Sequence, residues 1–367
     1  MIINSLKKSM LMALVLVNIL SFGCKPNNNN DENNDLIVLK DQGSFTVGGT
    51  IIQNQGTYDG SKFDNFKPYP EGQTYHGDHA YVFYQIPDKA RPLPLVFLHG
   101  AGQSSKTWET TPDGREGFQN IFLRRKYATY LVDQPRRGKA GRSTVPASIE
   151  PTADEQMWFE IFRIGIWPNY FDNVQFPRDK ESLDNFFRQM TPNTGPFDNG
   201  VITNSLVELF DKVGNGILVT HSQGGLPGWF IGINSNNVKA IVSYEPGTYP
   251  FPEGELPQPI TGRTGVLSGV EVPLEDFLKL TKIPIIMYFG DNIGEEITEE
   301  LGAENWRTRQ SLGKLFVETI NRHGGDATLV ELPKIGIVGN THFPMSDLNN
   351  IEIADLLSDW LKEKGLD

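Results

Sequence analysis

Cysteine is almost missing from this chain of 367 residues, in which Cys24 is the only one. A disulfide within the chain therefore cannot form, and neither can a zinc site built on several cysteines. Basic residues are also scarce, since 33 Lys and Arg stand against 45 Asp and Glu for a formal net charge of −12. A nucleic-acid partner would need a basic face, so the charge argues against nucleic-acid binding.

Motifs of several enzyme classes are missing as well. The sequence contains no P-loop, no glycine-rich dinucleotide-binding turn and no zinc-protease motif, so neither a cofactor nor a metal is implied. The cluster His76-Gly77-Asp78-His79 has no second group of ligands and is interpreted as a polar turn before a strand. Hydrophobic residues make up 38% of the chain, which is enough to bury a sizeable core.

The first residues have the pattern of an export signal. Lys7 and Lys8 precede an apolar run from Met10 to Phe22, which is shorter than the about 20 residues that a bilayer-spanning helix needs. Because Cys24 follows this run, residues 1–23 are predicted to be a bacterial lipoprotein signal peptide and Cys24 the lipidated residue. A plain signal peptide with an incidental cysteine is the alternative. The lipid anchor would hold the exported protein on a bacterial membrane of the cell envelope, facing the periplasm or the cell surface.

The rest of the chain divides into a tether and one catalytic domain. Residues 24–44 are rich in Asn and other polar residues and are predicted to be a flexible tether. Over residues 45–367, short apolar runs alternate with helical patterns, which predicts an α/β fold with a mostly parallel sheet and helices on both faces. The predicted strands are Phe45–Ile52, Tyr81–Ile86, Pro94–Leu98, Ala128–Val132, Ile217–Thr220, Val238–Ser243, Ile283–Phe289 and Ala327–Leu332.

Residues 144–200 interrupt this alternation and contain no clear strand. Two helical patterns fit there instead, Thr152–Phe162 and Arg178–Met190, and aromatic residues are frequent. A small satellite core is one interpretation, but we expect a helical cap over the C-terminal edge of the sheet, with rings that line a substrate pocket. The residues predicted to line that pocket are Trp158, Phe159 and Phe162.

Ser222 is the predicted nucleophile. The run Ile217-Leu218-Val219-Thr220-His221-Ser222-Gln223-Gly224-Gly225 is a buried strand that ends on a serine among small residues, and a helix can follow it. This is the strand–turn–helix context of a nucleophile elbow, in which the serine is strained and small neighbours let the chain fold past it. Thr220 stands where the usual motif has its first glycine.

A second pattern predicts an oxyanion hole. The strand at 94–98 ends in His99-Gly100-Ala101-Gly102, and the chemistry needs backbone N–H groups directed at the developing negative charge. The candidates are the amides of Ala101 and of Gln223, the residue after the nucleophile. His99 is interpreted as a structural loop residue.

The base is expected to follow the serine along the chain. His342 lies in a loop between the last strand and the last helix and is the predicted base, whereas His323 ends a predicted helix, where a structural role is favoured. The acid is ambiguous. Asp291 follows the strand Ile283–Phe289, while Glu245 follows the preceding strand and has one more methylene. Spacing alone favours Asp291.

Further motifs are spread over residues 45–365 and occur at Tyr84-Gln85-Ile86-Pro87, Thr107-Trp108-Glu109-Thr110-Thr111-Pro112-Asp113-Gly114-Arg115, Val132-Asp133-Gln134, Glu245-Pro246-Gly247, Phe289-Gly290-Asp291 and Gly339-Asn340. Together with the elbow they resemble those of a small group of secreted bacterial α/β-hydrolase esterases with a Ser-His-Glu triad. The resemblance implies that Glu245 is the acid and that Asp291 supports a loop or a helix N-terminus. It also implies a homodimer.

These patterns predict a serine hydrolase that cleaves carboxylic esters through an acyl-enzyme intermediate. Ser222 would attack, His342 would act as base and Glu245 would orient His342. The expected partner is a small-molecule ester, and no cofactor is needed. Two alternatives stay open: an amidase or lactonase on the same triad, and a cell-envelope binding lipoprotein whose hydrolase fold is inactive.

Overall fold

The computed structural model describes residues 36–263 and 265–367. The predicted signal peptide, Cys24 and most of the predicted tether lie outside these residues. Ile37–Asp367 form one compact unit. Within the described ranges, no helix combines the length and the apolar character that a membrane crossing requires.

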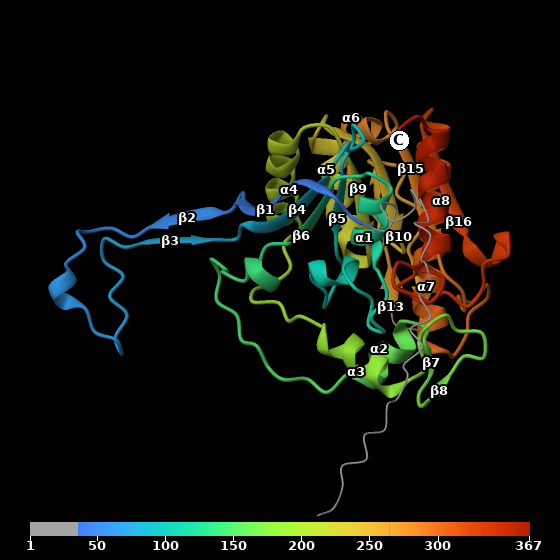
Figure 1. The fold of residues 1–367 in the computed structure, drawn as a ribbon, viewed down its shortest axis with the longest axis horizontal. Coiled ribbons are helices and arrows are strands. Elements are labelled where there is room, and N and C mark those ends of the chain that lie inside the picture. Colours follow the sequence, from blue (N-terminus) through green and yellow to red (C-terminus); the bar gives the residue numbers. More distant parts are fainter. Residues whose placement is uncertain (1–35, 264) are drawn as a thin grey trace, which may run out of the picture. The chain divides into compact units, whose positions relative to one another are not determined.

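An eight-stranded sheet forms the centre of this unit (Figure 1). Its strands are, in spatial order, β1 (Leu39–Val47), β4 (Ala80–Pro87), β6 (Thr129–Asp133), β5 (Leu95–Leu98), β9 (Gly216–His221), β10 (Val238–Tyr244), β15 (Pro284–Phe289) and β16 (Asp326–Glu331). The pairs β1–β4 and β4–β6 are antiparallel, and all pairs from β6 to β16 are parallel. The predicted mostly parallel sheet is confirmed.

Helices cover both faces of the sheet. One face carries α1 (Phe118–Arg124) and α8 (Asn350–Glu363), and the other carries α4 (Asn199–Val213), α5 (Gly225–Asn234), α6 (Leu274–Leu280) and α7 (Leu301–Arg322). Alternate strand residues supply the two cores: Leu95 and Phe97 point to the first face, and Val96 and Leu98 to the second. Every side chain of β5 is buried, as expected of a strand covered on both faces.

The remaining elements lie in insertions between the sheet strands. The segment between β6 and β9 contains α2 (Glu155–Ile161), β7 (Gly165–Ile166), β8 (Asn169–Tyr170) and α3 (Lys180–Arg188), which Figure 1 shows together below the sheet. Helices α2 and α3 fall within the two predicted ranges, but β7 and β8 pair as a short hairpin where no strand was predicted. The later insertion contains β11 (Pro250–Pro252), β12 (Ile260–Gly262), β13 (Gly265–Leu267) and β14 (Val270–Val272). Short 3-10 helices are η1 (Gly60–Lys62), η2 (Ser105–Trp108), η3 (Gly138–Ala140), η4 (Ser222–Gly224) and η5 (Leu332–Ile335).

The N-terminal border of the sheet differs from the prediction. Because β1 begins at Leu39 and pairs with β4, residues 39–44 belong to the sheet and not to the predicted tether. Their polar composition suits an edge strand, which has one side open to solvent. The predicted strand Phe45–Ile52 is also interrupted, since Gly48 and Gly49 have φ values of +69° and +101°. After this bend, β2 (Thr50–Gln53) leaves the sheet and pairs with β3 (Thr74–Gly77).

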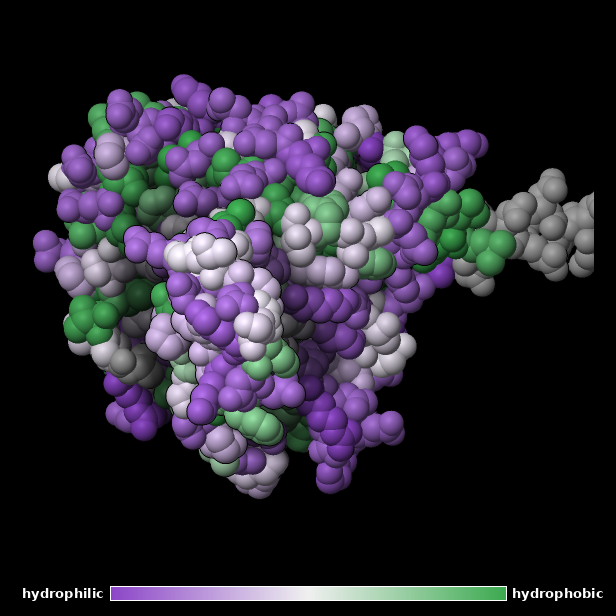
Figure 2. Space-filling model, turned by 90° about the vertical axis from the view of Figure 1, so that its left-hand side faces the viewer, coloured by the Kyte–Doolittle hydropathy of each residue, from purple (hydrophilic) through white to green (hydrophobic). Residues whose placement is uncertain are grey.

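Residues 50–77 form an arm that projects from the β1–β4 edge of the sheet (Figure 1). Figure 2 looks onto this side of the molecule, where hydrophilic residues cover most of the surface. The arm nevertheless exposes several large apolar side chains, and Phe66 is 93% exposed. The others are Ile51, Ile52, Tyr58 and Phe63.

Gly228 lets α5 pack directly against β9. A Cβ atom at this position would lie 2.7 Å from Cγ2 of Thr220. The Thr220 hydroxyl donates a hydrogen bond of 2.7 Å to Oγ of Ser243 on β10. Thr220 can therefore occupy the usual glycine position of the elbow because the facing helix supplies a glycine instead.

We expect Gly228→Ala to destabilise the protein by about 1–3 kcal/mol through overpacking, although Ala favours a helix. Thr220→Ser removes Cγ2 and keeps the hydroxyl. The added Cβ would then meet Thr220 atoms only at 3.6 and 3.7 Å, which is ordinary contact. Urea unfolding should therefore show that Gly228→Ala costs stability in the parent and little in the Thr220→Ser background. An equal cost in both backgrounds would contradict this packing.

Candidate active site

Ser222 lies in a tight turn between β9 and α5. Its φ is +55°, a left-handed conformation that is strained for any residue except glycine. Neighbouring glycines make room for the turn: a Cβ at Gly224 would lie 2.6 Å from the carbonyl oxygen of His99, and one at Gly225 would lie 2.6 Å from Cβ of Pro246. The predicted strained turn is therefore present, and Ser222 is half-buried at its tip.

The predicted nucleophile, base and two oxyanion-hole residues line one cavity of about 270 Å³, the Ser222 cavity. They are Ser222, His342, Ala101 and Gln223. The other lining residues are Trp158, Ile161, Phe162, Phe197, Leu226, Gly247, Thr248, Asn305, Trp306 and Arg309. A larger depression of about 780 Å³ between residues 106–114 and α3 contains none of the predicted residues.

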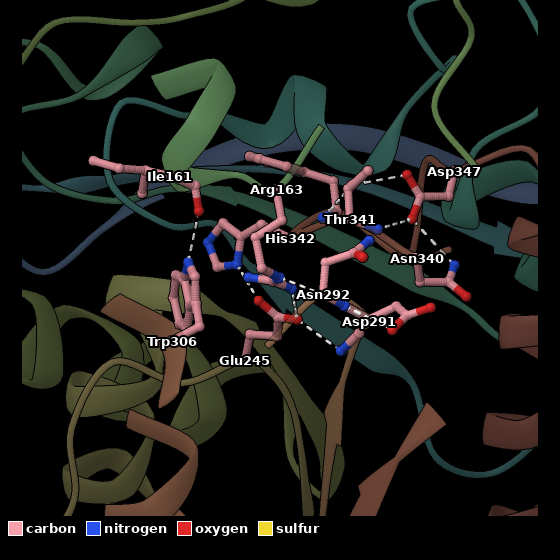
Figure 3. A network of polar contacts seen from close by, with 12 residues as sticks. Ile161, Arg163, Glu245, Asp291, Asn292, Trp306, Asn340, Thr341, His342 and Asp347 are labelled. Atoms are coloured by element: carbon pink, nitrogen blue, oxygen red, sulfur yellow. Dashed lines mark hydrogen bonds and ion pairs between the residues drawn. The ribbon is translucent and has the colours of Figure 1, made fainter. Parts of the chain in front are cut away.

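His342 is held from several sides. Its amide donates a hydrogen bond of 2.9 Å to the carbonyl oxygen of Phe162, and its Nδ1 lies 2.5 Å from Oε2 of Glu245 (Figure 3). The ring stacks on Phe162 at a centroid distance of 5.4 Å and packs in a tilted arrangement against Trp306 at 4.0 Å. These contacts fix the orientation of the imidazole and leave Nε2 as the nitrogen that can face a reacting group.

Glu245, and not Asp291, is the carboxylate that contacts His342. Glu245 is fully buried, follows β10 directly and has φ +48°. Its Oε1 accepts a hydrogen bond of 2.7 Å from the amide of Gly290 and pairs with the guanidinium of Arg163. Asp291 instead accepts a hydrogen bond of 2.7 Å from the amide of Gly339 and so holds the loop before His342.

Two of the three predicted pocket aromatics reach the Ser222 cavity. Trp158 and Phe162 lie four positions apart on one face and stack on each other at 5.1 Å. The prediction for Phe159 is wrong. Its ring is fully buried and packs edge-on against Trp167 and Tyr170. Because Phe159 is the residue after Trp158, the helical rotation of about 100° per residue directs its side chain away from the cavity.

Asp347 organises the loop that carries His342. Its carboxylate accepts hydrogen bonds of 2.7 Å from the amide of Thr341, 2.8 Å from the Thr341 hydroxyl and 3.1 Å from the side chain of Asn340 (Figure 3). Arg115 approaches from the other side and donates to the carbonyl oxygens of Ser346 and Asp347. The unusual run that ends at Arg115 thus supports the loop of the predicted base.

Comparison with known proteins identifies relatives of this chain. No family model matches it. A solved structure described as a novel bacterial esterase is 31% identical, with a TM-score of 0.71, and the match covers 89% of this chain and 97% of that one. The chain belongs to the α/β-hydrolase superfamily. The hydrolase is also 28% identical to the probable secreted lipase phiG of a fungal species, over 84% of this chain and 89% of the relative.

Burial sets the protonation of this hydrolase's site. It lowers the pKa of His342 to about 4, against the opposing effect of Glu245, so the imidazole is neutral near pH 7. Burial would raise the pKa of Glu245, but Arg163 and the hydrogen bond to His342 outweigh it and leave that pKa below its ordinary value. Glu245 is therefore a buried carboxylate, and His342 is a neutral imidazole.

Several residues around the site carried no local sequence signal. Arg163, Asn305, Trp306 and Arg309 reach it from segments far from the elbow and from His342. His221, next to Ser222, packs on the His342 ring at 4.4 Å, and its Nε2 lies 2.8 Å from the His342 carbonyl oxygen. Within the described residues, no group of three or more His, Cys, Asp and Glu side chains has the geometry of a metal site.

The Asp347 carboxyl predicts a pH-dependent stability. Burial raises its pKa to about 7, against an unfolded value of about 3.9. Between pH 4 and 7 the unfolded chain therefore loses this proton while the folded one keeps it, so the stability contributed by Asp347 falls as the pH rises. Urea unfolding at pH 4.5, 6 and 8 should show the parent losing stability relative to Asp347→Asn up to about pH 7 and no further above it. A stability difference that does not change with pH would contradict the raised pKa.

Proposed function

We propose that this protein is a serine carboxylesterase with the triad Ser222, His342 and Glu245. The observation that carries the proposal is the contact of Glu245 with Nδ1 of a neutral, buried His342 that shares a cavity with the strained Ser222. An imidazole that is fixed by a carboxylate on one nitrogen has the other available as a general base. The similarity to an esterase and to a probable lipase supports ester substrates.

The reaction would proceed through an acyl-enzyme. Oγ of Ser222 attacks the ester carbonyl carbon and gives its proton to Nε2 of His342, while Glu245 stabilises the imidazolium. The tetrahedral adduct then collapses, and the alcohol leaves with the proton from His342. Water next transfers a proton to His342 and attacks the acyl carbon, which releases the acid and returns the proton to Ser222.

The amides of Ala101 and Gln223 would hold the negative oxygen of the tetrahedral adduct. Both residues line the Ser222 cavity, and Gln223 directly follows the nucleophile. Such donors act on charge that develops only during the reaction, so they stabilise the transition state more than the substrate. Removal of one such donor in other enzymes costs about 10²–10³ in rate.

The same triad could cleave amides or lactones, and paired ester, amide and lactone substrates would separate these activities. An inactive binding lipoprotein is disfavoured by the complete set of Ser222, His342 and Glu245. Failure of the folded protein to react with any fluorophosphonate probe would favour that reading.

We further propose export to the cell envelope with Cys24 as the lipidated residue. The similarity to a probable secreted lipase supports export. Incorporation of labelled palmitate that is lost in Cys24→Ser would test the anchor. Homodimerisation is also part of this proposal, and the exposed apolar side chains of the arm support it because soluble monomers rarely leave such groups uncovered together. Sedimentation velocity measures it directly.

Ser222→Ala should abolish ester hydrolysis. We expect the parent to cleave p-nitrophenyl butyrate and the variant to lose at least about 10³-fold in kcat, because the nucleophile acts as a unit with its base. Release of p-nitrophenol measures both rates, and thermal unfolding of the variant verifies its fold. Equal rates in parent and variant would disprove the nucleophile.

Glu245→Gln and Asp291→Asn distinguish the two candidate acids. Glu245→Gln keeps the size of the side chain but removes the charge that stabilises the imidazolium, so kcat should fall by about 10³–10⁴. Asp291→Asn keeps an oxygen that can accept the Gly339 amide, so its kcat should stay within about tenfold of the parent. The reverse order of the two losses would assign the acid to Asp291.

A further inference from the structure

Arg309 brings a positive charge to the wall of the Ser222 cavity. Over residues 36–263 and 265–367, no Asp or Glu forms an ion pair with it, and none lines the cavity. The other arginine near the site, Arg163, is paired with Glu245. A guanidinium that is partly withdrawn from water without a carboxylate is a costly arrangement unless a ligand supplies the charge.

Among the described residues, the Arg309 guanidinium has one hydrogen-bonded nitrogen, Nη1, and two nitrogens without an acceptor, Nε and Nη2. Its Nη1 donates hydrogen bonds of 2.7 Å to both the carbonyl and the side-chain oxygen of Asn305, and the guanidinium lies 5.4 Å from the Trp306 ring centroid. In the described part of the chain, Nε and Nη2 have no acceptor, and neither is sealed from the cavity or solvent. Nε and Nη2 form the planar fork that binds a carboxylate with two parallel hydrogen bonds.

The rest of the cavity suits a small molecule with an apolar part. Its volume of about 270 Å³ is at the lower end of ligand pockets. Trp158, Phe162 and Leu226 give it apolar walls. The guanidinium is thus the single formally charged group among the described residues that line the cavity, whose other side chains are apolar or polar and uncharged, and an opposite charge is attracted there more strongly than in bulk water.

We propose that the natural substrates are small esters that carry a carboxylate, and that Arg309 binds this carboxylate while Ser222 attacks the ester. The inference rests on the proposed ester hydrolysis and adds the charge of the substrate. The carboxylate can belong to the acyl part or to the alcohol part, because both parts of a small ester lie in the same cavity as Ser222. Arg309 is then a specificity-determining residue and not part of the triad.

Matched pairs of esters test the effect of a substrate carboxylate separately on the alcohol part and on the acyl part. On the alcohol side, 4-acetoxybenzoate is compared with its neutral isostere 4-acetoxybenzamide. On the acyl side, monomethyl glutarate is compared with methyl glutaramate. For each pair, the ratio of the two kcat/KM values is measured in the parent, in Arg309→Met and in the charge-preserving Arg309→Lys. Arg307→Gln is the control, because Arg307 lies on the same helix but pairs with Glu304 outside the cavity.

The parent should prefer the anionic ester in at least one pair. Arg309→Met should lower that preference at least about tenfold, mainly through KM, while Arg309→Lys retains part of it and Arg307→Gln retains all of it. The pair that responds identifies the side that carries the carboxylate. A parent without preference in both pairs, or a preference that Arg309→Met leaves unchanged, would overturn the proposal.

A binding measurement tests the anion site independently of ester hydrolysis. If the neutral esters are not cleaved either, the esterase proposal fails, and the charge is then tested by quenching of tryptophan fluorescence with benzoate and with benzamide. Tighter binding of benzoate to the parent than to Arg309→Met would support the anion site without catalysis, and equal binding would overturn it. Should Arg309→Met not fold, the Arg309→Lys variant and the comparison of benzoate with benzamide in the parent decide.

Discussion

The carboxylate of Glu245 has no contact with solvent, and this buried charge constrains the structure around it. An isolated carboxylate in such a place would cost many kcal/mol, so its partners must be in position whenever the chain is folded. The sheet supplies one of these partners. Glu245 and Gly290 follow the adjacent parallel strands β10 and β15, so the Gly290 amide lies at the same edge of the sheet and donates a hydrogen bond to Glu245. Arg163 supplies the compensating cation, and His342 takes the remaining oxygen.

Arg163 and the two residues before it connect the C-terminal end of α2 to the site. Three consecutive residues make the connection: the carbonyl of Ile161 accepts from the Trp306 indole, that of Phe162 accepts from the His342 amide, and Arg163 reaches Glu245. Arg163 also donates 2.7 Å to the carbonyl of Asp291, which locks its orientation. This end of the proposed cap cannot lift from the sheet without exposing an unpaired charge. Any opening of the cavity must therefore come from other parts of its wall, such as the half-exposed Phe197.

Local patterns were sufficient for residues whose position depends on neighbours in sequence. Ser222 was predictable because a buried strand followed by glycines dictates the turn, and His342 because it follows the last strand. Glu245 was not, since spacing favoured Asp291 and only the resemblance pointed to the glutamate. Arg163, which pairs with Glu245 in the fold, is separated from it by 82 positions and lies in no sequence motif. The prediction for Phe159 was wrong for a related reason. Tertiary packing decides which side of α2 faces the cavity, and the sequence of the helix alone does not.

The guanidiniums of Arg163 and Arg309 both lie against the indole of Trp306, but they differ in role. Arg163 stabilises the fold, whereas Arg309 is available to bind a substrate. Arg163 and Arg309 lie 5.6 and 5.4 Å from the Trp306 ring centroid, and the Trp306 ring packs against His342. Burial is the main cause of the lowered pKa of His342, and both cations add to it. Arg163 is neutralised within the fold, so its role is complete before any substrate binds. Arg309 faces the cavity with an open edge, and its charge is balanced only when an anion enters, so the energy of that pairing is available to choose among substrates.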